Sequence, residues 1–471
     1  MIAVAIGLQA LAALDALRWL RVAQREHYLA GAVTRFAARW WRVGIGLSLR
    51  GRTSKLVWTR RLRVLALIAL VLHVGVFLAF IAVFPAAVAS ALSLVLVPLT
   101  IDAALYVATP LEARALRPFV TQATDKLATI KPTIVGITGS YGKTSTKVVL
   151  AHLLDGTKAV YASPRSVNNR AGLSQAINDG LSPGTEVFVA EMGTYGPGEI
   201  AELCEWCPPT IAIITAIGPV HLERFGSEDN TLKAKSEILV PATGVILNED
   251  DERLAKLAND IAADDTKHVV RASATRADAD IAVLADDEGG RVYEGGVLLG
   301  RVSRLPTAPG NVACAVAAAR ALGVSGDDIV QRLETAPVAS HRLEEIPAPS
   351  GAVVLDDTFN ANPAGARRAL EALARAGAPG GRKVVMTPGM IELGPRQADE
   401  NEQFAAEAAK VASIVGVIGR TNRKALLNGL LGTTVDVHTF RTRDKAVAWV
   451  RANLTAGDAV LYENDLPDLY K

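Results

Sequence analysis

The sequence predicts an α/β protein in which two parallel-sheet domains follow an α-helical transmembrane segment. Three observations support this fold class. Half of the 471 residues are hydrophobic, and the excess is concentrated in the first 110 positions. After residue 132, β-runs alternate with helical patterns, which is typical of parallel sheets with crossover helices. A glycine-rich turn at 136–142 joins the first of these β-runs to a helical pattern.

The N-terminal region contains two or three candidate membrane spans. The run from Val64 to Phe84 has 21 residues without a charge, which is enough to cross a hydrocarbon core of about 30 Å. A second run extends to about residue 108 and is broken only by Asp102, so we expect a transmembrane hairpin with Pro85 near its turn. The first apolar segment, residues 2–17, is shorter and contains Asp15. It is a third span, a signal-anchor or an interfacial helix. Basic residues follow this segment rather than precede it, which disfavours a cleaved signal peptide.

Charge predicts the orientation of this segment. Residues 18–63 contain twelve Lys or Arg and a single acid, Glu26. The positive-inside rule keeps such a loop in the cytoplasm, and the hairpin then returns everything after residue 110 to the same side. We therefore expect a multi-pass protein of the cell membrane with cytoplasmic catalytic domains. A stripe of Arg35, Arg39 and Arg42 fits a helix on an anionic leaflet, or is a topology signal without a further role.

Composition excludes some classes of function. The net charge of +2 gives no basic field for a nucleic-acid partner. Three cysteines are too few for a disulfide framework. Cys204 and Cys207 form a lone CxxC pair, and a zinc site would need two more ligands, so a structural or incidental role is favoured.

The stretch "KPTIVGITGSYGKTSTKVVLAHLL" predicts a phosphate-binding loop. Residues 134–137 form a buried β-run, and a helical pattern opens at Lys143. Backbone N–H groups of such a loop close around phosphate, aided by the helix N-terminus. Lys143 would contact the β- and γ-phosphates and Thr144 would bind Mg²⁺, so ATP and Mg²⁺ are the expected cofactors. The first glycine, however, lies one residue earlier than the strict pattern requires. The candidate nucleotide-binding residues are Gly139, Ser140, Gly142, Lys143, Thr144 and Ser145.

Four further stretches follow in order: "SVNNRAGL", "VFVAEMGTYGPGEIAEL", "PPTIAIITAIGPVHLERFGSEDNTLKAKSEIL" and "LDDTFNANPAGARRAL". Together with the loop, they make residues 132–471 similar to the Mur ligase family, and most closely to its MurF-type members. The resemblance implies an enzyme that activates a carboxylate with ATP as an acyl phosphate, which an amine then attacks to give an amide, ADP and phosphate. It also implies a P-loop central ATPase domain and a C-terminal Rossmann-like domain.

The resemblance assigns roles to individual residues. Glu191 would bind Mg²⁺ with Thr144, and His221 looks like a second-metal ligand. Lys235 matches a lysine that the family carries carbamylated, and Lys233 is its neighbouring competitor. Lys143, His221 and Lys235 are accordingly the expected catalytic residues. The remaining assignments are substrate contacts at Asn168 and Asn169, and nucleotide contacts at Asn248, Arg342, Asp357 and Asn360.

The chain departs from the family pattern at four places. The membrane segment stands where relatives have a UDP-binding domain. Cys314 replaces a second asparagine, which we expect only to pack a helix, and Asn401 replaces a histidine. The C-terminal "LYENDLPDLYK" is acidic where MurF-type members carry a basic segment near the substrate. Its acids, Glu463, Asp465 and Asp468, form a capping or solubilising tail, or face an incoming amine and repel a carboxylate.

We expect a membrane anchor at 1–110, a linker at 111–130, a central ATP-binding domain at 131–338 and a C-terminal domain at 339–471. An acidic, Gly-rich stretch at 262–303 is expected to form a β-hairpin insertion. The leading hypothesis is a MurF-like ATP-dependent ligase of peptidoglycan precursor synthesis. Its expected partners are an amino-acid or dipeptide amine donor and a muropeptide-like carboxylate acceptor, which is either UDP-linked or lipid-linked. A membrane-tethered poly-γ-glutamate-type synthase and a non-catalytic nucleotide-binding scaffold are the alternatives.

Overall fold

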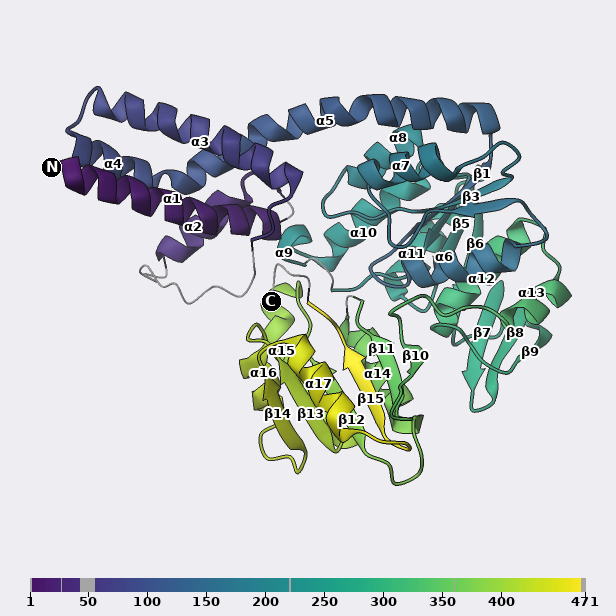
Figure 1. Ribbon diagram of the computed structural model, residues 1–471. Helices are drawn as coiled ribbons and strands as arrows, with labels where there is room; N and C mark the ends of the chain where they lie inside the picture. The colour runs from purple at the N-terminus through teal and green to yellow at the C-terminus, as the bar shows by residue number, and fades with distance from the viewer. Residues whose placement is uncertain (1, 27, 43–55, 220–221, 360, 467–471) are drawn as a thin grey trace. The chain divides into compact units, whose positions relative to one another are not determined.

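The computed structural model describes residues 2–26, 28–42, 56–219, 222–359 and 361–466. The chain divides into two compact units, residues 1–117 with 419–421 and 466–471, and residues 118–418 with 422–465. Figure 1 labels the helices and strands of both units.

The first unit is helical. It contains α1 (Ile2–Arg25), α2 (Ala32–Arg42), α3 (Arg60–Ile81), α4 (Ala86–Val95) and the beginning of α5 (Val97–Ile130). By length and composition α1 and α3 can each cross a membrane, and the bent pair α4 and α5 is a third candidate. Pro85 lies between α3 and α4, at the expected turn.

The second apolar run differs from the expected single span, because α4 and α5 are bent by 59° at a break. Pro98 stands in the first turn of α5 and has no backbone N–H to continue the preceding helix, so the chain restarts there. Residues 111–130, expected as a linker, are the second half of α5.

Asp102 explains how a carboxylate is accommodated within the apolar α5. It is buried, and its oxygens accept hydrogen bonds from the backbone N–H groups of Gly31 (3.0 Å), Val33 (3.3 Å) and Thr34 (2.6 Å). These N–H groups lie at the start of α2, where a helix has unsatisfied donors and the positive end of its dipole. Asp102 therefore caps α2 from a position far away in the sequence.

The second unit contains a nine-stranded sheet in the order β2-β3-β1-β4-β5-β6-β7-β8-β9. Its parallel strands are β1 (Thr133–Thr138), β2 (Val160–Ala162), β3 (Val187–Glu191), β4 (Ile211–Ile214), β5 (Gly244–Asn248), β6 (His268–Ser273) and β7 (Ile281–Asp286). β8 (Gly289–Glu294) and β9 (Val297–Val302) continue antiparallel from β7 and form a β-hairpin, whereas β6 and β7 of the same expected insertion are parallel strands of the sheet. One face of the sheet packs against α6 (Lys143–Leu154), α12 (Pro309–Ala321) and α13 (Gly326–Leu333).

The opposite face of this sheet is covered by helices from several parts of the chain. They are the second half of α5, α7 (Arg170–Gly180), α8 (Glu199–Trp206) and α11 (Glu252–Ala262). α5 contributes Val120, Ala123 and Leu127, which recur at helical spacing on its buried face. The short helices α9 (Leu222–Phe225) and α10 (Glu228–Ser236) lie between β4 and β5 in the chain.

A second sheet follows, with six strands in the order β10-β11-β15-β12-β13-β14. β10 (Glu344–Pro347) is antiparallel to β11 (Val353–Asp357), whereas β12 (Lys383–Thr387), β13 (Ile414–Ile418), β14 (Asp436–Phe440) and β15 (Ala459–Glu463) run parallel to β11. α14 (Pro363–Arg375), α15 (Gln397–Val411) and α16 (Arg423–Gly429) cover one face, and α17 (Arg443–Asn453) covers the other. The fold is thus mixed α/β with parallel sheets, as the sequence predicts.

Candidate nucleotide and metal site

The glycine-rich turn leads from β1 directly into α6, as predicted. Gly139 and Gly142 have φ angles of 150° and 82°. A Cβ at Gly139 would lie 2.0 Å from the Thr215 hydroxyl, and one at Gly142 would lie 2.1 Å from Oδ1 of Asn311. Both positions therefore require glycine, because a side chain would strain the backbone and clash with a neighbour.

Two side chains hold this loop in shape. The Ser140 hydroxyl accepts a hydrogen bond from the Gly218 N–H at 3.0 Å, and the Ser140 N–H donates to the Ala216 carbonyl at 2.8 Å. The Lys143 ammonium donates to the Gly139 carbonyl at 2.7 Å. Burial lowers the pKa of Lys143, the Glu191 carboxylate opposes this shift, and the Arg342 guanidinium adds to it.

Glu191 is the centre of a buried polar cluster beside the loop. It is the last residue of β3, in register with Ile137 of β1, so its carboxylate is presented where α6 begins. The Thr144 hydroxyl donates to it at 2.8 Å, and the Asn168 amide donates to its other oxygen at 3.0 Å. Three predicted site residues are therefore brought together, although Asn168, expected as a substrate contact, binds Glu191.

Sequence reasoning missed Lys147, which completes this cluster. Its ammonium lies 3.2 Å from Glu191, and it also donates to the Ser163 hydroxyl and the Arg165 carbonyl. Burial lowers the pKa of Lys147, and the Glu191 carboxylate opposes this shift. A signal was present in the sequence, because Lys147 follows Lys143 by four residues and so lies on the same face of α6.

The structure distinguishes the two candidate lysines of α10. Lys235 is 3% exposed, whereas Lys233 is exposed to solvent. Burial lowers the pKa of Lys235 well below its usual value, and the positive charge of Lys143 lowers it further. These conditions favour the neutral amine at Lys235, which is the form that reacts with carbon dioxide.

Some predicted site residues make contacts that differ from the expected ones, and others are not among the residues that the structure describes. His221, Asn360 and Asp468 lie outside the described residues. Ser145 is buried within α6, and Asn169 caps α7 by accepting the Gly172 N–H at 3.0 Å. In the described part of the chain, no group of three His, Cys, Asp or Glu side chains forms a metal site.

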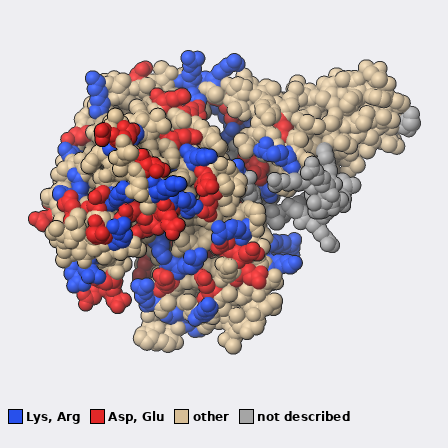
Figure 2. Space-filling view, turned by 180° about the vertical axis from the view of Figure 1, so that it is seen from behind, with Lys and Arg blue, Asp and Glu red and all other residues tan. Residues whose placement is uncertain are grey.

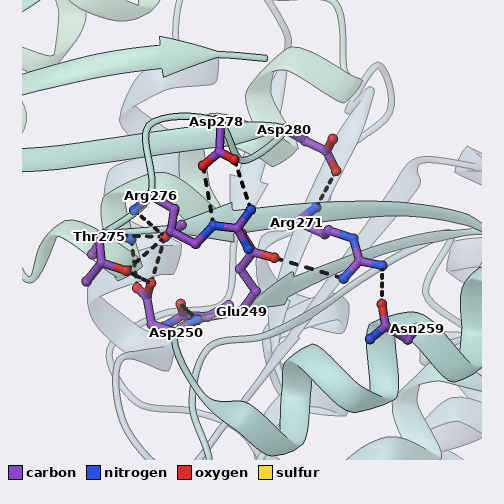
Figure 3. A network of polar contacts seen from close by, with 11 residues as sticks. Glu249, Asp250, Asn259, Arg271, Thr275, Arg276, Asp278 and Asp280 are labelled. Carbon is purple, nitrogen blue, oxygen red and sulfur yellow. Dashed lines mark hydrogen bonds and ion pairs between the residues drawn. The ribbon is translucent and has the colours of Figure 1, made fainter. Parts of the chain in front are cut away.

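Asn248 is the last residue of β5, and the residues that follow it belong to a polar network. Its amide donates to the Thr215 carbonyl at 3.0 Å, which connects it to the residue packed against Gly139. The next residues, Glu249 and Asp250, belong to the network in Figure 3. There the Asp250 carboxylate accepts from the Ala274 N–H and the Thr275 hydroxyl, both at 2.7 Å. A cavity of about 580 Å³ adjoins Asn248, lined also by Asp250, Asp251, Glu252 and Arg253.

The second sheet places charged side chains at the carboxyl ends of β11 and β15. Asp357 ends β11, and Glu463 ends β15 in register beside it. Burial raises the pKa of Asp357 to about 6, and Arg342 and Arg368 oppose this shift. The Arg342 guanidinium lies 4.5 Å from the centre of the Phe359 ring. Arg342 and Asp357, both expected as nucleotide contacts, thus lie in one charged cluster.

The expectation of an acidic C-terminal tail is wrong for Glu463. This residue is fully buried as the last position of β15, a central strand of the second sheet. Asp465 forms an ion pair with Arg443 at 2.7 Å. Glu463 and Asp465 are therefore part of the folded C-terminal domain and not of an exposed tail.

The other departures have structural roles. Cys314 lies within α12 and is fully buried in the core, as expected for a packing residue. Asn401 stabilises the loop after β12, because its side chain accepts a hydrogen bond from the Met390 N–H at 2.7 Å and donates one to the Met390 carbonyl at 2.9 Å.

The CxxC pair is buried. Cys204 and Cys207 are free cysteines, and burial raises the pKa of both thiols.

Comparison with known proteins places these features in context. Residues 137–298 match the Mur ligase middle domain, and residues 341–462 match the Mur ligase, glutamate ligase domain. The UDP-N-acetylmuramoyl-tripeptide–D-alanyl-D-alanine ligase of Mycobacterium tuberculosis H37Rv is 33% identical over 371 residues, which cover 70% of this chain and 69% of the relative. The enzyme of the same name from Bacillus subtilis is 28% identical, with 70% and 72% covered.

Solved structures give the same result for the fold. MurF from Acinetobacter baumannii superposes with a TM-score of 0.63 at 25% identity, over 74% of this chain and 77% of that one. MurF ligase from Thermotoga maritima in complex with ADP gives a TM-score of 0.64 at 24% identity, over 74% and 80% of the two chains.

Proposed function

The chain belongs to the Mur ligase family, and from that premise we propose that it joins an amine donor to a muropeptide-like, lipid-linked carboxylate at the membrane. It is a MurF-like, ATP-dependent, amide-bond-forming ligase of peptidoglycan precursor synthesis. The relatives at 28–33% identity are named for joining D-alanyl-D-alanine to UDP-N-acetylmuramoyl-tripeptide, and these substrates are the starting point for this chain.

The residues around the loop fit a magnesium nucleotide. The Thr144 hydroxyl and the Glu191 carboxylate are hard oxygen donors 2.8 Å apart, which is the donor set that Mg²⁺ prefers. When bound, Mg²⁺ would neutralise charge on the transferring phosphoryl group. We assign Thr144, Glu191, His221 and carbamylated Lys235 as the metal ligands. The lowered pKa and burial of Lys235 support its assignment.

The chain's own groups would hold the nucleotide. The proposed P-loop, residues 139–145, offers backbone N–H groups to the phosphates, and Lys143 offers its ammonium. Asn248 would contact the adenine side, next to the cavity at the end of β5. Arg342, Asp357 and Asn360 would contact the nucleotide from the Rossmann-like domain, and Asn168 and Asn169 remain proposed substrate contacts. Substitution of these residues would leave the reacting groups less well oriented. Orientation of the reactants supplies much of the rate enhancement in reactions of this kind.

The N-terminal helices support a membrane location. Large apolar side chains point outward along α3, where Leu67 is 62% and Val71 64% exposed. In Figure 2 the surface over the N-terminal helices is mostly uncharged, whereas the rest carries mixed charge. A surface of this kind is stable in hydrocarbon rather than in water. We propose a multi-pass anchor at 1–110 with a basic cytoplasmic loop, followed by the segment 111–130 and catalytic domains at 131–338 and 339–471.

The full-length protein in detergent tests this function. Phosphate release with Mg-ATP would be measured for D-Ala-D-Ala or single amino acids, each paired with a UDP-linked or a lipid-linked muropeptide. Release that needs both an amine and a muropeptide supports the ligase, and preference for the lipid-linked acceptor supports the role of the anchor. Release driven by glutamate alone would indicate the polymer synthase, and ATP binding without release would indicate the scaffold. Full activity on soluble UDP-linked acceptor after deletion of residues 1–110 would contradict the membrane proposal.

A further inference from the structure

The ammonium of Lys147 joins three separate segments beside the first sheet. Its partners are a carboxylate oxygen of Glu191 at 3.2 Å, the Ser163 hydroxyl at 3.5 Å and the Arg165 carbonyl. Lys147 lies in α6, Glu191 ends β3, and residues 163–169 form the loop that connects β2 to α7. A lysine ammonium has three N–H donors, and these three acceptors use all of them. Lys147 therefore connects the loop to the helix that begins at the proposed nucleotide site.

The backbone of Arg165 is strained at the point where Lys147 contacts it. Its φ angle is 46°, in the left-handed region that costs free energy for residues other than glycine. A strained conformation persists only where surrounding contacts stabilise it. The residue itself is exposed, whereas its carbonyl oxygen accepts a hydrogen bond from the buried ammonium of Lys147. This hydrogen bond therefore offsets the cost of the left-handed turn.

A second connection ties the other end of the loop to the same carboxylate. The Asn168 amide donates to the second oxygen of Glu191 at 3.0 Å, while the Asn168 carbonyl accepts from the Gly193 N–H at 2.8 Å. The Thr144 hydroxyl donates at 2.8 Å to the oxygen that Lys147 also contacts. A Cβ at Gly193 would lie 2.7 Å from the side chain of Asn168, so the loop packs closely against the chain after β3. Glu191 is therefore tied to both ends of the loop.

We propose that Lys147 is a positioning residue for the carboxylate acceptor, and that it acts by holding the Arg165 carbonyl and with it the 163–169 loop. The inference rests on the proposed function, in which this loop carries an acceptor contact at Asn168 and α6 begins at the nucleotide. The two substrates must be held at a fixed spacing, since a displacement of about 1 Å can cost roughly a hundredfold in rate. Lys147 sets this spacing because it joins the helix to the loop. Balancing the charge of Glu191 would by itself require no contact with Arg165.

Three substitutions at Arg165 change the loop and leave the buried ion pair in place. Proline fixes φ near about −65° and so excludes the present turn, glycine adopts the turn without strain, and alanine removes only the side chain. In the full-length protein with saturating Mg-ATP and D-Ala-D-Ala, we expect kcat/KM for the muropeptide acceptor to fall about tenfold or more in Arg165→Pro. Arg165→Gly and Arg165→Ala should stay close to the wild type, and ATP affinity by calorimetric titration should be the same in all three. An equal fall in Arg165→Ala and Arg165→Pro would assign the effect to the side chain and overturn the proposal.

Lys147→Met tests the ammonium itself. If Lys147 acts through the Arg165 carbonyl, adding Arg165→Pro to Lys147→Met should cause no further loss of kcat/KM for the acceptor, because both substitutions break the same contact. Losses that add would show that Lys147 acts on Glu191 and not on the loop, and would overturn the proposal. Arg165→Pro changes an exposed position, so its series decides the question even if Lys147→Met does not fold.

Hydrogen exchange of the substrate-free protein, measured by mass spectrometry in detergent, follows the loop without any catalysis. Backbone amides of residues 165–169 should exchange faster in Lys147→Met and Arg165→Pro than in the wild type. Lys158→Met, which breaks a surface ion pair with Glu186, should leave this exchange unchanged. Faster exchange without turnover of any acceptor would support the Lys147 contact and count against the ligase function alone. Wild-type turnover with equal exchange in all of these proteins would overturn the positioning role and leave the ligase intact.

Discussion

The ammonium of Lys147 lies 3.2 Å from a carboxylate oxygen of Glu191, and the two side chains are only 3% and 2% exposed. Glu191 also accepts the Thr144 hydroxyl, so Lys147 balances the charge of the residue that we assign to Mg²⁺. A buried ion pair of this kind contributes less through its own attraction than through the cost of leaving one partner behind.

Lys147→Met tests this relationship, because it removes the cation and leaves the Glu191 charge buried. We expect the free energy of unfolding to fall by about 3–5 kcal/mol, as measured by denaturant unfolding in detergent. Lys158→Met is the matched control, since Lys158 pairs with Glu186 at 3.6 Å on the surface and should cost about 1 kcal/mol or less. Equal losses in the two variants would contradict a special role for the buried pair.

Gly142→Ala is expected to weaken ATP binding. The new methyl group would meet Asn311 in a backbone conformation with φ of 82°, so the loop must shift away from its present shape. A tenfold or greater loss of affinity, about 1.4 kcal/mol, should appear in calorimetric titration with ATP. Gly184→Ala has the same kind of φ angle, 91°, but open space around it, and should leave ATP affinity unchanged.

Lys235 is expected to carry a carbamate near neutral pH. Its pKa lies well below the usual value of 10.5, so the neutral amine is available without alkaline conditions. A carbamate resonance should therefore appear by ¹³C NMR at about pH 8 in ¹³C-bicarbonate, where an ordinary lysine is almost fully protonated. Lys235→Ala should lose the resonance, and Lys233→Ala, at the exposed neighbour, should keep it. A signal that needs a pH above 10 would exclude the depressed pKa.

Asp357 should make the protein less stable as pH rises. Its folded pKa of about 6 is above the ordinary value of 3.8, so the folded state binds the proton more tightly than the unfolded state. Stability from this group is complete below pH 4 and is lost as pH rises to about 6. The melting temperature of Asp357→Asn should fall less than that of the wild type between pH 4 and pH 6.5. Parallel curves for the two proteins would show that Asp357 titrates normally.

Asp102→Leu should release the start of α2. The substitution keeps an apolar helix but removes the acceptor for three backbone N–H groups. Losing one buried acceptor costs about 1–3 kcal/mol, so trypsin should cleave after Arg35 faster than in the wild type. Asp125→Leu changes an exposed acid on the same helix α5 and should leave the cleavage rate unchanged.

Local sequence determined much of this protein. The glycine-rich turn lies between β1 and α6 as predicted. Positive φ angles favour glycine, and the period of the hydrophobic residues distinguishes strand from helix over a short segment. The β-runs containing residues 353–357, 383–387, 414–418 and 459–463 are strands for the same reason. The long apolar helices α1 and α3 follow from composition alone, whereas the break before Pro98 does not.

Only the tertiary structure decided which charged groups meet. Lys147 reaches Glu191 because β1 and β3 are neighbours, Asp102 reaches α2 across about 70 residues of chain, and Glu463 lies beside Asp357 because β15 inserts next to β11. Strand order and helix packing are set by the burial of whole apolar faces, to which these polar residues contribute little. A charged side chain therefore has the same local pattern whether it ends in solvent or in a buried pair, and its chemistry depends on the neighbour that the fold supplies.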